Sequence, residues 1–126
     1  MKLKLNQSYN IAELIELVKN KQDRDLDNSG KAKYNLENSY CVYISKDEKL
    51  NKHSILYVGK PVEIDDDDNE IYPKEVLENN LEMCYSDEDF QDVIDLAYAQ
   101  KSNASIDEII RCLNHYVEND TFLDLV

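Results

Sequence analysis

The residues of this sequence most suited to chemistry are carboxylates gathered near the middle of the chain. They comprise Glu63, Asp65, Asp66, Asp67, Asp68 and Glu70. Such a group could hold a cation, exchange protons with a substrate, or attract a basic partner. The spacing of the acids and the composition of the rest of the chain help to decide between these three.

A specific calcium site is not predicted. A calcium loop of the EF-hand type needs glycine at its sixth position and glutamate at its twelfth. Counted from Asp65, these positions hold Glu70 and Val76, and the register that starts at Asp66 fails in the same way. The run of aspartates therefore lacks the spacing that defines this motif.

The remaining candidate ligands and nucleophiles complete no known pattern. Cys112 and His115 lie three residues apart, but no second Cys/His pair supplies the four ligands of a zinc site. His53 lies in a polar stretch, where an exposed imidazole is expected. Motifs of nucleophilic hydrolases, metalloproteases and phosphate-binding loops are absent from the sequence. We therefore predict no metal, no cofactor and no enzymatic activity.

The distribution of charge favours recognition of a basic protein. Residues 61–95 contain 14 Asp/Glu and one Lys, so this stretch alone carries the formal net charge of −13 that the whole chain has. A patch of one sign speeds association with an oppositely charged partner. Direct binding to nucleic acid or to an anionic membrane is disfavoured, because both require clustered Lys and Arg.

Length and composition predict one cytoplasmic domain. A chain of 126 residues is the usual size of a single domain with one modest core. No run approaches the 18 apolar residues of a membrane-spanning helix, and no apolar stretch of a signal peptide follows the first lysines. The odd set of Cys41, Cys84 and Cys112 is expected to remain reduced.

The patterns along the chain predict an α+β domain. Helix starts at Asn10, Pro73, Ser86 and Ser105 indicate about four helices. Residues 40–44 and 55–58 are β-branched and aromatic, so we expect an antiparallel sheet of two to three strands, with residues 62–64 continuing the second. Residues 23–38 and 65–70 read as loops, and residues 83–85 as an extended link.

Apolar side chains at helical spacing predict which faces are buried. On the last three helices the expected core residues are Val76, Leu77, Leu81, Phe90, Val93, Ile94, Ala97, Ile106, Ile109, Ile110, Leu113 and Val117. His115 is expected on the exposed face of the last helix, and Cys112 at the edge of the buried one. The apolar tail Phe122, Leu123, Leu125 and Val126 is expected to dock on the core.

Residues 116–123, with the sequence YVENDTFL, give the second half of the chain a resemblance to a known family. It resembles small bacterial immunity proteins encoded beside polymorphic toxins, including those of contact-dependent growth inhibition systems. Family members typically end in an aromatic residue, then Asn-Asp, then Ala-Phe-Ile, and here Thr121 and Leu123 replace the Ala and the Ile. The resemblance covers about residues 40–126. It implies a protein that binds and blocks the toxin domain of a sibling cell, often a nuclease with a basic cleft.

Three hypotheses follow from these observations. The leading one is an immunity protein that neutralises a cognate toxin C-terminal domain by covering it with an acidic surface. The expected contacts are Glu63, Asp65, Asp66, Asp67, Asp68 and Glu70, with Tyr72 packing at their edge. An alternative is an acidic DNA mimic, or antitoxin-like protein, that sequesters a DNA-binding protein. The third is a small enzyme or calcium-binding module.

Overall fold

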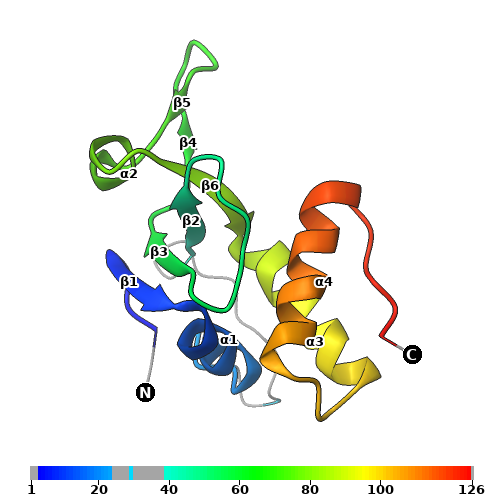
Figure 1. Cartoon of the computed structure of the whole chain (residues 1–126). Helices are drawn as coiled ribbons and strands as arrows, with labels where there is room; N and C mark the ends of the chain where they lie inside the picture. The colour runs from blue at the N-terminus through cyan, green and yellow to red at the C-terminus, as the bar shows by residue number, and fades with distance from the viewer. Residues whose placement is uncertain (1–2, 24–28, 30–38, 126) are drawn as a thin grey trace.

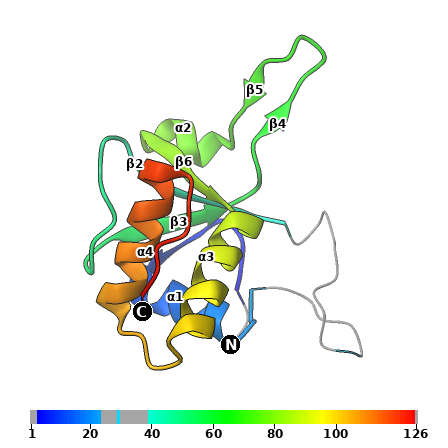
Figure 2. The same ribbon diagram turned by 90° about the vertical axis from the view of Figure 1, so that its right-hand side faces the viewer.

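The computed structural model describes residues 3–23, 29 and 39–125 and confirms an α+β domain. Its main sheet is antiparallel and has the strand order β1-β3-β2-β6. The strands are β1 (Gln7–Asn10), β2 (Cys41–Ser45), β3 (Ile55–Gly59) and β6 (Leu81–Ser86). Helices α1 (Ile11–Lys19), α3 (Asp87–Gln100) and α4 (Ile106–Asn119) lie on one side of this sheet (Figures 1 and 2). The short helix α2 (Lys74–Glu78) and a hairpin of β4 (Glu63–Ile64) and β5 (Glu70–Ile71) lie beyond the other side (Figure 2).

The helix starts predicted from capping residues are confirmed. The Asn10 side chain accepts a hydrogen bond from the Ala12 backbone N–H at 2.9 Å. The Ser86 hydroxyl accepts one from Asp89 at the start of α3. At the start of α4, Ser105 and Glu108 form a reciprocal capping box. These bonds satisfy N–H groups that have no partner within the helix, so the caps fix where each helix begins.

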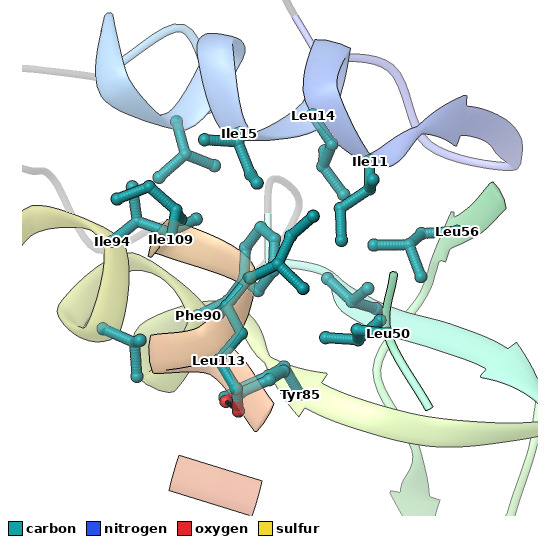
Figure 3. Close-up of a cluster of buried hydrophobic side chains, with 14 of the residues drawn as sticks. Ile11, Leu14, Ile15, Leu50, Leu56, Tyr85, Phe90, Ile94, Ile109 and Leu113 are labelled. Carbon is teal, nitrogen blue, oxygen red and sulfur yellow. Dashed lines mark hydrogen bonds between the residues drawn. The ribbon is translucent and has the colours of Figure 1, made fainter. Parts of the chain in front are cut away.

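The core lies between the sheet and the three larger helices (Figure 3). Side chains alternate across each strand, which turns Val42, Leu56 and Tyr85 toward the helices. Fully buried residues that meet them are Ile11, Leu14, Ile15, Phe90, Ile94, Ile109 and Leu113. Burying one such side chain contributes about 1.5–3 kcal/mol to the free energy of unfolding.

The sheet is larger than the two to three strands expected. Strand β1 pairs with β3, and residues 83–85, predicted to be an extended link, belong to the edge strand β6. The register between β2 and β6 shifts between Val42 and Tyr43, which is a β-bulge. A second correction concerns residues 62–64, which do not continue β3. They leave the sheet after Pro61, and Glu63 and Ile64 pair with β5 instead.

Two side chains predicted to be buried are exposed. Leu77 on α2 is 67% exposed and Val117 on α4 is 55% exposed. Helix α2 is only five residues long and has a single packed face. Val76 occupies this face, which leaves the side chain of Leu77 exposed to solvent. Val117 lies one turn beyond Leu113, the last buried residue of α4. The helical periodicity continues there, but the core beneath it has ended.

Other expectations differ in smaller ways or lie outside the described residues. Leu81, expected on the second helix, begins strand β6 and is half-buried. His115, expected to be exposed, is also half-buried, and Cys112 is buried. Leu123 and Leu125 of the tail pack against the core as predicted. Phe122 is 45% exposed and lies against the Tyr116 ring instead, so the prediction was wrong for this residue. Val126 lies outside the described residues, as do most of residues 23–38.

A buried polar network joins the turn after α1 to Tyr40, the residue before β2, and to α3. The Asp23 carboxylate, 5% exposed, accepts hydrogen bonds from the Tyr40 hydroxyl and from the Gln91 amide. Burial, followed by the charge of Asp23, raises the pKa of Tyr40 well above its usual value. The phenol therefore stays protonated and serves as a hydrogen-bond donor to the buried carboxylate.

Candidate protein-binding site

The predicted acidic residues stand on a two-stranded arm, defined here as residues 63–72. The arm projects away from the body of the domain, with strands β4 and β5 side by side and the turn at its tip (Figures 1 and 2). It carries six carboxylates, and no Lys or Arg occurs between Pro61 and Pro73. The structure thus brings together the predicted residues Glu63, Asp65, Asp66, Asp67, Asp68 and Glu70 on one protrusion.

Asp65 shapes the turn at the tip of the arm. Its carboxylate oxygen Oδ1 accepts hydrogen bonds from the backbone N–H groups of Asp67 and Asn69, each at 2.9 Å. Its carbonyl accepts a third from the N–H of Asp68, whose φ of 62° is left-handed. The bond from the Asn69 backbone N–H is the largest cause that lowers the pKa of Asp65. Asp65 is therefore a turn residue as well as a charge, whereas Asp66, Asp67 and Asp68 present exposed side chains.

The arm also exposes two apolar side chains that were not among the predicted site residues. Ile64 is 60% exposed and Ile71 is 47% exposed. Glu63 pairs with Ile71 and Ile64 pairs with Glu70, so each face of the ribbon carries one isoleucine beside one glutamate. The available signal was the repeated Glu-Ile at 63–64 and 70–71, on either side of the aspartates.

Tyr72 lies at the base of the arm. Its hydroxyl donates a hydrogen bond to the Glu70 carboxylate, and this bond is the first cause that raises the pKa of Tyr72. Together with Val62, it packs against a small cluster of Cys41, Tyr43 and Val76. Tyr72 is half-buried, so it anchors the arm to the body and stands at the edge of the acidic surface.

Most of the other acids of residues 61–95 lie in helices α2 and α3, and Glu82 lies in strand β6. Asp87, Glu88 and Asp89 form the first turn of α3, where the helix dipole favours negative charge. Burial is the first cause that raises the pKa of Asp87, which accepts a hydrogen bond from the backbone N–H of Glu88. These carboxylates have a local structural role, as Asp65 does in the turn, unlike the exposed Asp66, Asp67 and Asp68.

The described residues contain no group of three or more His, Cys, Asp or Glu placed to hold a metal ion. The His115 ring contacts the Asn119 amide and the Thr121 hydroxyl, each at 3.3 Å.

Burial raises the pKa of the thiols of Cys41, Cys84 and Cys112, and that of Cys84 to about 12. His53 is exposed.

Comparison with known proteins finds one family. Residues 25–125 match the family described as "Domain of unknown function (DUF7716)". No curated protein and no solved structure matches the chain. In the part of the chain that the structure describes, no helix has the length and apolar character needed to cross a bilayer.

Proposed function

We propose that this chain, which belongs to the DUF7716 family, is a protein inhibitor that inserts its acidic arm into the basic cleft of a toxin domain. In the cell it would act as a cytoplasmic immunity protein and protect its producer from a cognate toxin. The observation that carries the proposal is the arm itself, a narrow protrusion with six carboxylates and two exposed isoleucines. The resemblance of residues 116–123 to immunity proteins agrees with it.

The arm combines two contributions to binding that act at different distances. Its charges attract a basic surface over the Debye length, about 8–10 Å at ordinary ionic strength. After contact, Ile64 and Ile71 can leave water. Full burial of an isoleucine contributes about 1.5–3 kcal/mol, so the apolar residues slow dissociation while the acids speed association.

The shape of the arm favours a cleft over a flat surface as its binding site. A ribbon with a glutamate and an isoleucine on each face can contact two walls at once. Enzymes that cleave nucleic acid line their clefts with Lys and Arg, because these residues hold phosphates. Carboxylates at the tip would occupy the positions of phosphates, so we propose a nuclease domain as the target.

The proposal predicts that a toxin domain is encoded beside the gene of this protein, and co-expression with that domain tests it. Wild type should restore growth of the host, whereas the triple variant D66N/D67N/D68N should protect poorly. These three carboxylates are chosen because Asp65 also forms the turn. A matched variant, E13Q/E48Q/D124N, removes three exposed charges outside the arm and should protect like wild type.

Three results would overturn the proposal. One is a lack of protection by the wild type, and another is equal protection by both triple variants. The third is recovery of a DNA-binding protein as the stoichiometric partner by native mass spectrometry, since this outcome would support the DNA-mimic alternative.

A further inference from the structure

A groove of about 440 Å³ lies on the face of the sheet opposite the three large helices. The side chains of Ile55, Tyr57 and Leu81 line it from strands β3 and β6. Glu75 and Asn79 line it from α2 and the residue that ends this helix. Its volume lies in the range of sites that bind small molecules or side chains.

The groove and the base of the arm share one side of the molecule. Tyr57 and Leu81, which line the groove, pack on the cluster of Cys41, Tyr43 and Val76. Tyr72 and Val62 at the base of the arm pack on the same cluster. The groove therefore adjoins the base of the arm, so one protein could contact both.

The chemistry of the groove suits a basic side chain. Glu75 carries the one formal charge among the described residues that line it. On α2, Lys74 pairs with Glu78 at 3.6 Å, and no ion pair within the described residues involves Glu75. Burial, and then the charge of Glu75, raises the pKa of Tyr57, which agrees with a carboxylate close to the phenol.

The aromatic wall of the groove is held in place. The Tyr57 hydroxyl donates a hydrogen bond to Asn6 Oδ1 at 3.3 Å, and its ring centroid lies 6.2 Å from that of Tyr43. A Cβ at Gly59 would lie 2.6 Å from Cε1 of Tyr57, so the glycine provides the space for this ring. An aromatic face beside a carboxylate accommodates both the aliphatic stem and the cationic head of Arg or Lys.

We propose that this groove takes an arginine or lysine side chain of the partner protein, as a second contact beside the arm. The inference rests on the proposed function for the identity and the basic character of that partner. The cation would lie against the Glu75 carboxylate and the Tyr57 ring, and its stem would contact Ile55, which is 57% exposed. We choose a basic side chain as the occupant because its charge complements that of Glu75 and because the proposed partner has a basic surface.

The test uses NMR titration of the whole protein with a capped Leu-Arg-Leu peptide. The same peptide with uncharged citrulline in place of arginine is the matched probe. With the arginine peptide we expect saturable shifts of the Ile55 methyl and Asn79 side-chain amide signals, and weaker shifts with citrulline. E75Q should weaken binding about fivefold, the loss expected of one exposed charge pair. E78Q, on the same helix but outside the groove, should bind like wild type.

The outcomes separate this inference from the proposed function. Equal responses to the two peptides, or an unchanged affinity in E75Q, would overturn the groove as a site for a basic side chain. Loss of the response in D66N/D67N/D68N would place the peptide at the arm and overturn it as well. Binding in the groove without protection by the wild type in co-expression would keep the site and remove the toxin as its partner.

Discussion

The hydroxyl of Tyr85, on edge strand β6, donates a hydrogen bond to the backbone carbonyl of Leu113, on helix α4. The Tyr85 ring also lies 5.5 Å from that of Phe90 and 6.0 Å from that of Tyr116, between ring centroids. One side chain thus joins the edge of the sheet to two helices. Among the described residues β6 pairs only with β2 in this sheet, so the link through Tyr85 adds a second attachment of the strand to the body.

Replacing Tyr85 with Phe should lower the free energy of unfolding by about 1 kcal/mol, the net value of one buried hydrogen bond. Denaturant unfolding would measure the change. Tyr72→Phe is the control, since it also removes a hydroxyl with a hydrogen bond, but at an exposed oxygen. Equal losses in the two variants would mean that the Tyr85 bond contributes no more than a surface contact.

Ile110→Ala should destabilise the domain by roughly 2–5 kcal/mol, because a buried side chain is removed and a cavity remains. Ile110 is 6% exposed and lies on the core face of α4. On the same helix Val117 is 55% exposed, so Val117→Ala should change stability by no more than about 0.5 kcal/mol. Thermal unfolding of the pair would test the prediction, and similar melting temperatures would contradict the assigned helix face.

Asp65→Ala should loosen the arm, whereas Asp65→Asn should keep it ordered. Alanine removes the acceptor for the Asp67 and Asn69 N–H groups, but the asparagine side-chain carbonyl can replace it. Backbone order parameters from NMR would show lower values at residues 66–69 in the alanine variant alone. The melting temperature should stay close to that of wild type, because a two-residue strand pair contributes little to global stability.

The capping residue Glu108 should make stability depend on pH in the acid range. Its hydrogen bond from Lys101, and then the bond from the Ser105 N–H, lowers the pKa of Glu108 from 4.5 to about 2. A lowered pKa in the folded state stabilises the fold above the unfolded value of 4.5, and the stabilisation is lost as the pH falls toward 2. Melting temperatures of wild type and E108Q should differ at pH 7 and converge near pH 2. A constant difference would refute the assignment.

Salt should slow association with the toxin domain more than it speeds dissociation. The attraction of residues 61–95 acts over a distance that added salt shortens. Stopped-flow measurements at increasing ionic strength would separate the two rates. An association rate that does not change with salt would contradict electrostatic steering by the arm.

The helices were predictable because their capping residues lie next to them in the sequence. The sheet was harder to predict because its strands pair with segments far away in the sequence. Asn10, Ser86 and Ser105 cap helices through bonds to residues two or three positions away. Residues 83–85 were predicted to be extended, but strand β6 is defined by its pairing with β2, about 40 residues earlier, which no local pattern indicates.

From the sequence alone, the charges of the candidate site on the arm could be predicted, but its shape could not. The acids from Glu63 to Glu70 are read directly from the sequence. Pro61 is a local signal for a break in the strand, but it does not show that the chain leaves the sheet and exposes Ile64 and Ile71. The groove combines residues from positions 6 to 81, so it exists only in the folded chain.

The shallow attachment of the arm has a consequence for how this protein can diversify. Val62 and Tyr72 are its points of packing on the body, and the residues between them stand outside the core. Changes in their number or identity leave the packing of Phe90, Ile94 and Leu113 untouched, because surface hairpins tolerate insertion and substitution far better than interiors do. Under the proposed function, substitutions within the arm can therefore change which partner is bound without changing the packing of the core.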